Sequence, residues 1–194
     1  MRIVVLTGSP HKRGTSNTLV EEFIKGAEES GHNVVRFDTP FLNIHPCIGC
    51  DRCGMNGPCV FNDDMPKILD TILDSDMIVF ATPIYYFGFS AQIKAAIDRF
   101  YSRNGRIQSK HLKSAFIVTA WNNDNQVMQA IDKHIDILID YLNLDNLGKI
   151  LAKGYGYVGA RLEDEYKREA YELGRSVRQF YDRCLCTCVT TRVL

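Results

Sequence analysis

The sequence has 194 residues, of which 45% are hydrophobic and 24% charged, as is typical of one globular domain with a full hydrophobic core. Lysine plus arginine and aspartate plus glutamate balance at 23 each, which argues against nucleic acid or an anionic membrane as the main partner. We therefore expect one domain over residues 1–194, with no nucleic-acid partner and no membrane partner.

The first residues, MRIVVLTGSP, contain an apolar run that is too short for a secretory signal, and no later run approaches the length of a membrane span. We therefore expect a cytoplasmic protein whose seven cysteines remain reduced. This compartment makes disulfides the least favoured interpretation of the cysteines and raises the weight of metal or redox chemistry.

Short β-branched apolar runs alternate with amphipathic stretches along the chain. The runs are continuously apolar, as expected for strands that are buried on both faces of a parallel sheet. The predicted strands are Arg2–Leu6, Asn33–Phe37, Met77–Ala81, Ala115–Ala120 and Lys149–Gly154.

Five helices are predicted after these strands. Thr18 begins a capping-box pattern for the first helix, and Gly31 is its stop signal. Asp63 or Asp64 can cap the second helix, and Ser90 can cap the third. Apolar residues at helical spacing mark the last three helices, over Ile93–Phe100, Val127–Leu142 and Tyr166–Tyr181.

This order predicts an α/β fold, in which a five-stranded parallel sheet is covered by helices on both faces. In such folds, ligands bind in the crevice beyond the carboxyl ends of the strands. The loops that follow the strands are therefore the places where function is expected.

The loop after the first strand, TGSPHKRGTSNT (7–18), matches neither a dinucleotide-binding nor a Walker A pattern. It offers hydroxyl and amide donors at a helix N-terminus, where free N–H groups and the helix dipole favour an anion. A capped helix after a solvated polar loop explains this segment, taken alone, equally well. The candidate ligands of a single phosphate are Ser9, Ser16, Asn17 and Thr18, with positive character nearby from His11, Lys12 and Arg13.

Two further loops carry aromatic side chains. The loop TPIYYFG (82–88) follows the third strand, and its exposed apolar residues need cover from a flat ligand or from a neighbouring subunit. The loop WNNDN (121–125) follows the fourth strand. Its carboxamides can either bond the edge of a heterocycle or form a solvated turn that caps the next helix.

A phosphate-binding loop combined with these two loops describes a site for flavin mononucleotide (FMN). Here the sequence resembles the flavodoxin-like NADPH-dependent FMN reductase superfamily, and within it the iron–sulfur flavoproteins. The motifs that carry the resemblance lie in roughly the first 100 residues. They are Gly8-Ser-Pro, Gly14-Thr-Ser-Asn-Thr18, the cysteine stretch followed by Asp63-Asp64-Met65, Ala81-Thr-Pro-Ile-Tyr85, and Lys94 with Asp98-Arg99.

The resemblance implies a flavodoxin-like three-layer sandwich with FMN at the loops. It assigns the phosphate to Ser9, His11, Ser16, Asn17 and Thr18, the isoalloxazine ring to Pro83, Ile84, Tyr85, Tyr86 and Phe87, and further contacts to Trp121 and Asn122. It gives structural roles to Lys94, Asp98 and Arg99. Two features depart from the family: His11 stands where arginine is frequent, and the 121–125 loop lacks the usual glycines.

The implied activity is that of an FMN-dependent NAD(P)H oxidoreductase, in which the flavin performs the chemistry. Its acceptor would be a quinone, an azo or nitro compound, free flavin or a carrier protein. One alternative is an electron-transfer iron–sulfur flavoprotein that a ferredoxin-like partner reduces without nicotinamide, and another is a metal-bound regulatory module with a vestigial flavin site. The neutral charge favours the enzyme, because flavodoxin-type carriers tend to be acidic. A homodimer or homotetramer is also expected.

The stretch CIGCDRCGMNGPC lies in a cysteine-rich loop expected over residues 46–62 and contains Cys47, Cys50, Cys53 and Cys59. Three cysteines separated by two residues each, with a fourth nearby, can turn their thiolates onto one [4Fe–4S] cluster. Nearby glycines permit the tight backbone reversals that this needs, Gly49, Gly54 and Gly57.

Zinc is less favoured at this stretch, because its sites usually join two C-x-x-C pairs across a longer spacer. Iron–sulfur flavoproteins share the compact spacing, whereas the rival interpretation is a loop of four reduced cysteines without metal. A second group, Cys184, Cys186 and Cys188, matches no familiar ligand set. We interpret these as cysteines of a tail, with metal binding as the alternative.

Overall fold

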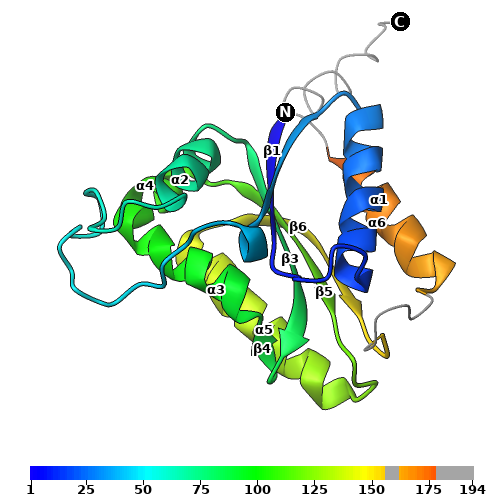
Figure 1. Ribbon diagram of the computed structural model, residues 1–194. Coiled ribbons are helices and arrows are strands. Elements are labelled where there is room, and N and C mark those ends of the chain that lie inside the picture. The colour runs from blue at the N-terminus through cyan, green and yellow to red at the C-terminus, as the bar shows by residue number, and fades with distance from the viewer. Residues whose placement is uncertain (156–161, 178–194) are drawn as a thin grey trace, which may run out of the picture.

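The computed structural model describes residues 1–155 and 162–177, in which strands and helices alternate (Figure 1). The strands are β1 (Arg2–Thr7), β2 (Asn33–Asp38), β3 (Met77–Tyr85), β4 (Gly88–Phe89), β5 (Lys113–Thr119) and β6 (Asp145–Ala152). The helices are α1 (Thr15–Glu29), α2 (Met65–Leu73), α3 (Ala91–Asp98), α4 (Asn104–Lys110), α5 (Asn125–Leu142) and α6 (Asp164–Ser176). Two 3₁₀ helices are η1 (Thr39–Phe41) and η2 (Arg99–Arg103).

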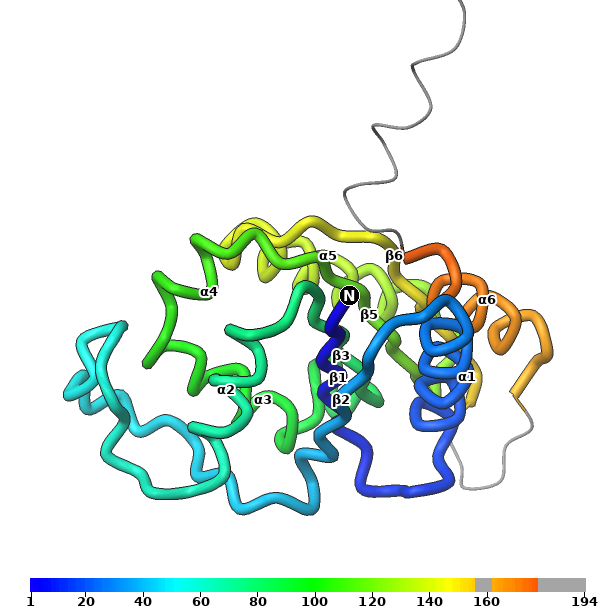
Figure 2. The backbone as a smooth tube through the Cα atoms, turned by 90° about the horizontal axis from the view of Figure 1, so that it is seen from above, coloured from blue at the N-terminus to red at the C-terminus, as the bar shows by residue number. Residues whose placement is uncertain are grey.

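The sheet has the parallel strand order β2-β1-β3-β5-β6, which is the order of flavodoxin-like doubly wound folds. Figure 2 shows α1 and α6 on one side of the strands and α2, α3 and α4 on the other. Successive side chains of β1 point to opposite faces of the sheet. Leu6 therefore packs with the helices α2 to α5, and Val5 packs with α1 and α6. The predicted three-layer α/β fold is confirmed.

One predicted helix cap, Thr18, is wrong, and a second, Ser90, holds in position only. Helix α1 begins at Thr15 with Gly14 as its N-cap, and Thr18 lies inside the first turn, where its hydroxyl donates to the carbonyl of Gly14 (3.2 Å). Ser90 stands at the N-cap position of α3, but its hydroxyl donates to the carbonyl of Gly8 (2.7 Å). The reason is close packing: a Cβ on Gly8 would lie 2.5 Å from the Ser90 Oγ.

Some observed elements extend or add to the predicted ones, and some predictions concern residues outside the described part of the chain. Strand β3 runs past Ala81 because Ile84 and Tyr85 pair with β4 in an antiparallel hairpin, and η2 and α4 follow α3 without having been predicted. The predicted end of the last helix at Tyr181 and the C-terminal cysteines lie outside the described residues. Among the helices within them, none has the length and apolar character needed to cross a membrane.

Candidate functional site

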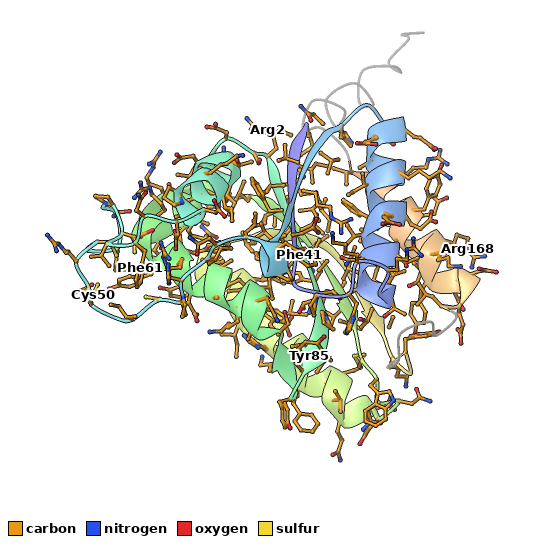
Figure 3. All side chains as sticks on the ribbon, viewed as in Figure 1. Arg2, Phe41, Cys50, Phe61, Tyr85 and Arg168 are labelled. Carbon is orange, nitrogen blue, oxygen red and sulfur yellow. The ribbon has the colours of Figure 1, made fainter. Side chains whose placement is uncertain are left out.

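A pocket of about 140 Å³ lies beyond the carboxyl ends of β1, β3 and β5, the edge at which doubly wound sheets bind ligands. Figure 3 shows the labelled Tyr85 at this end of β3. The lining residues are Ser9, His11, Gly14, Thr15, Ser16, Pro83, Ile84, Tyr85, Thr119, Trp121 and Tyr155.

The start of α1 forms the polar wall of this pocket. Gly14, as the N-cap, has no side chain to bond the first N–H groups of the helix, so these donors point outward for another acceptor. Ser9 and Ser16 are almost fully buried, although both line the pocket. A Cβ on Gly14 would lie 3.0 Å from the carbonyl oxygen of His11, a tight contact that favours glycine at this turn. Hydroxyls and N–H groups at a helix N-terminus suit an anion such as phosphate.

Two of the predicted phosphate ligands do not line the pocket. The Asn17 side chain donates to the carbonyl of His11 (2.9 Å) and accepts from Nη2 of Arg36 (3.1 Å). The Thr18 hydroxyl bonds within α1, as described above. Asn17 therefore holds the 9–14 loop in shape, and its amide is already occupied within the fold.

Some residues of the aromatic loop at the end of β3 line the pocket, and others lie on the surface. Pro83, Ile84 and Tyr85 line the pocket, whereas Tyr86 is fully exposed and Phe87 is 67% exposed at the tip of the hairpin. Both tip residues have positive φ, 46° and 67°, in a two-residue turn that normally selects asparagine and glycine. Bulky side chains in this conformation are strained.

Trp121 lines the pocket and is 77% exposed, whereas Asn122 does not line it. The side-chain Oδ1 of Asn122 accepts from the N–H of Asp124 (3.0 Å), and the Asp124 carboxylate caps α5 by accepting from the N–H of Gln126 (2.9 Å). The loop therefore forms the capping turn that was one of the two predicted roles, and it places Trp121, not a carboxamide, at the pocket.

Four lining residues were absent from the predicted ligands: Gly14, Thr15, Thr119 and Tyr155. The first two stand in the motif that carried the resemblance. Thr119 and Tyr155 end or follow strands of the sheet, so the rule on carboxyl ends of strands could have found them.

A second, larger cavity of about 540 Å³ is lined by all four cysteines of the predicted loop. Cys47 and Cys50 are exposed, Cys53 and Cys59 are half-buried, and none forms a disulfide. The backbone reverses through positive φ at Gly49 (64°) and Gly54 (49°), as predicted. Figure 3 shows Cys50 well separated from Tyr85, and the two cavities share no lining residue.

The donor chemistry of this cavity suits an iron–sulfur cluster, because four reduced thiols face one space. The thiols nevertheless stand apart: in residues 1–155 and 162–177, no three histidine, cysteine, aspartate or glutamate side chains are close enough to hold a metal ion. Binding would therefore require the four thiols to converge within this cavity.

A buried ion pair lies beside the cysteine cavity. Arg99 and Asp63 are 1% and 0% exposed, with Nη1 to Oδ2 at 2.6 Å and Nη2 to Oδ1 at 3.2 Å. Burial opposes the charge of Asp63, but the hydrogen bonds from Arg99 and from the N–H groups of His45 and Met65 lower the pKa of the carboxyl below its ordinary value. This arrangement fits the structural role that the resemblance gave to Arg99.

Comparisons with known proteins identify the family to which the chain belongs. The NADPH-dependent FMN reductase family matches residues 1–152. An iron–sulfur flavoprotein of Archaeoglobus fulgidus is 26% identical over 184 residues, which cover 94% of this chain and 81% of the relative. The putative NAD(P)H-dependent FMN-containing oxidoreductase YwqN of Bacillus subtilis is 25% identical over 162 residues, 79% of this chain and 86% of the relative. Alignments with three other iron–sulfur flavoproteins span 49% to 52% of the relatives' length.

Among solved structures, the NAD(P)H:quinone oxidoreductase from Methanothermobacter marburgensis has a TM-score of 0.71 at 16% identity, covering 90% of this chain and 94% of the other. At this identity the likeness shows the fold. The match over residues 1–152 covers most of the chain and includes the strand ends that form the pocket. The chain therefore belongs to the NADPH-dependent FMN reductase family, a family of NAD(P)H-dependent FMN oxidoreductases.

Proposed function

We propose that this chain acts as a single-domain, FMN-dependent NAD(P)H oxidoreductase that passes electrons to a small-molecule or protein acceptor. The observation that carries the proposal is the pocket at the carboxyl ends of β1, β3 and β5. It joins the polar start of α1 to an apolar wall formed by Pro83, Ile84 and Tyr85. A phosphate and a flat ring system, joined in one ligand, match these two walls.

In this site, the N–H groups of the first turn of α1 and the hydroxyls of Ser9 and Ser16 would hold the phosphate, with His11 at the open side. Pro83, Ile84, Tyr85 and Trp121 would lie along the ring. Bound FMN would supply the hydride and electron chemistry, and the protein would supply position and electrostatics. Tyr155 lines the pocket beside these residues, and burial, with a smaller contribution from its side-chain hydrogen bond to Glu163, raises the pKa of its phenol.

The acceptor class that we propose is a quinone, an azo or nitro compound, free flavin or a carrier protein. The second candidate is a flavoprotein that a ferredoxin-like partner reduces without nicotinamide. The balance of 23 basic and 23 acidic residues favours the enzyme, because an electron carrier that docks on charged partners usually has a strong charge of one sign.

The protein reconstituted with flavin is expected to be yellow and to release FMN, not FAD, on denaturation, because the pocket offers one phosphate site and no pyrophosphate motif. Anaerobic NADPH or NADH should bleach the flavin absorbance. Bleaching by reduced ferredoxin alone would favour the carrier. A protein that takes up no flavin would contradict both.

We further propose that Cys47, Cys50, Cys53 and Cys59 ligate a [4Fe–4S] cluster, which would link the flavin to an acceptor. All four line one cavity, and ligation requires reduced thiols, as in the cytoplasm. Anaerobic reconstitution followed by iron and sulfide analysis and by paramagnetic resonance of the reduced protein tests this. Sub-stoichiometric iron and no resonance signal would leave the four cysteines as a bare loop.

The assembly that we propose is a homodimer or a homotetramer. Tyr86 and Phe87 project from a strained hairpin, the first fully exposed and the second 67% exposed, which is costly unless another molecule covers them. Sedimentation of the flavin-bound protein is expected to give an oligomer, and the double variant Tyr86→Ser/Phe87→Ser a smaller species. A wild-type monomer throughout the micromolar range would overturn this proposal.

A further inference from the structure

The cysteine loop is fastened to one short segment of the chain, Arg99–Asn104, which comprises η2 and the first residue of α4. Six hydrogen bonds from four residues of this segment reach the 45–63 loop. Three come from Arg99: Nη1 donates to the His45 carbonyl (2.7 Å) and to Asp63 Oδ2 (2.6 Å), and Nη2 donates to Asp63 Oδ1 (3.2 Å). The other three run from the Tyr101 hydroxyl to Asp51 Oδ1 (2.7 Å), from Arg103 Nη1 to the Gly57 carbonyl (2.7 Å) and from the Asn104 N–H to the Met55 carbonyl (3.0 Å).

The attachment points follow the cysteines along the loop. Every cysteine stands within two residues of a point that Arg99–Asn104 holds: Cys47 after His45, Cys50 before Asp51, Cys53 before Met55 and Cys59 after Gly57. A loop with exposed cysteines and little core of its own would otherwise have many conformations. The spacing of the attachments therefore restricts the four thiols to the wall of one cavity.

Arg99 has an unused hydrogen-bond donor, its Nε–H. Its Nη atoms are occupied, but its Nε is buried and without a hydrogen-bond partner among the described residues. The guanidinium also lies over the ring of Phe61, 5.1 Å from its centroid. Burial opposes the charge of Arg99, but Asp63 and, after it, Cys59 raise the pKa of the guanidinium. Phe61, the ring that the guanidinium covers, lines the cysteine cavity two residues after Cys59, so Cys59 is the cysteine that the unused donor can serve.

We propose that Arg99–Asn104 is the positioning segment of the cysteine site, and that Arg99 donates its unused Nε–H to the Cys59 thiolate when the cluster is bound. This inference rests on the proposed cluster. Hydrogen bonds to cluster sulfurs help to set the reduction potential, and groups outside the ligand shell commonly change metal affinity about 10–100-fold. Arg99 would thus tune the cluster without touching iron.

The positioning role is tested with Tyr101→Phe, which removes one attachment near Cys50 and Cys53. Its matched control is Tyr171→Phe, which removes a hydrogen bond from an exposed tyrosine to Glu29 at the distant contact of α6 with α1. We expect Tyr101→Phe to need about tenfold more iron for half-reconstitution and to exchange the amides of the 45–63 loop faster in the apoprotein. The control should match the wild type, and equal behaviour of both variants would overturn the positioning role.

The hydrogen bond to Cys59 is tested with Arg99→Lys, which keeps the charge beside Asp63 but lacks Nε. The matched control is Arg2→Lys, which also keeps a positive charge beside an aspartate (Asp74, 3.7 Å) but lies outside Arg99–Asn104. A more negative cluster potential and an altered resonance spectrum are expected for Arg99→Lys alone. Equal potentials in both variants would refute the hydrogen bond.

Separate results would show an error in the proposed cluster and an error in the positioning role. If the wild-type protein takes up no cluster, the proposed cluster is wrong, whatever the variants do. The other result is that the wild-type protein and the variants Tyr101→Phe and Arg99→Lys all take up the cluster equally well and with the same reduction potential. In that case the cluster stands, and only the role of Arg99–Asn104 is wrong. Should Arg99→Lys fail to fold, Tyr101→Phe alone still decides the positioning role, because its hydroxyl lies on the surface.

Discussion

Replacing Ser16 by aspartate is expected to weaken FMN binding about 1000-fold while the domain stays folded. Ser16 lines the pocket in the first turn of α1, where we place the phosphate. A carboxylate about 4 Å from a phosphate charge, at an effective dielectric constant of about 20, costs about 4 kcal/mol of binding free energy. The same carboxylate interacts favourably with the N-terminal end of the helix dipole, so the fold should tolerate it.

Two comparisons separate charge repulsion from general damage to the pocket. Ser16→Ala removes one hydrogen bond to a charged group and should weaken FMN binding by about tenfold. Riboflavin has no phosphate, so its affinity should be the same for Ser16→Asp and for the wild type. Both affinities can be measured by quenching of flavin fluorescence. If Ser16→Asp bound FMN as the wild type does, the phosphate would lie elsewhere.

Replacing Arg99 by methionine is expected to lower the free energy of unfolding of the apoprotein by about 3–5 kcal/mol, because it leaves the carboxylate of Asp63 buried without its partner. Lys94→Met is the matched control: it breaks an ion pair with Asp98 on the surface of α3, where exposed pairs contribute about 1 kcal/mol or less. Urea denaturation measures both. Equal losses of unfolding free energy in the two variants would contradict the prediction and would mean that water reaches the Asp63 carboxylate.

The same pair predicts a dependence of stability on pH. The pKa of Asp63 is lower in the folded state than its ordinary value, so the stabilisation is complete above the unfolded-state pKa of about 3.9 and is lost as the pH falls through the folded-state value. The double variant Asp63→Asn/Arg99→Met lacks this ionisation and should lose less stability than the wild type below about pH 4. Parallel pH profiles would show that other carboxylates dominate acid unfolding.

The sequence alone determined the layers of the fold. Strands such as β1 and β3 are apolar on both faces because helices cover both sides of a parallel sheet, and this signal is contained in a few consecutive residues. The local sequence also identified Gly31 as the stop signal of α1, just after which it has φ of 79°. It likewise identified the glycines that reverse the cysteine loop. The place of the pocket also followed, because the carboxyl ends of parallel strands meet at one edge.

Only the tertiary structure decided which polar groups meet. Asn17 and Thr18 have the chemistry of phosphate ligands, but the loop occupies the amide of one and the helix occupies the hydroxyl of the other. Arg99 meets Asp63 across 36 positions of the chain. Periodicity and propensity act within one turn or strand, whereas hydrogen-bond partners distant in sequence depend on how packed elements bring them together. The attachment of the cysteine loop to Arg99–Asn104 therefore depends on the packed helices and has no signal in the sequence.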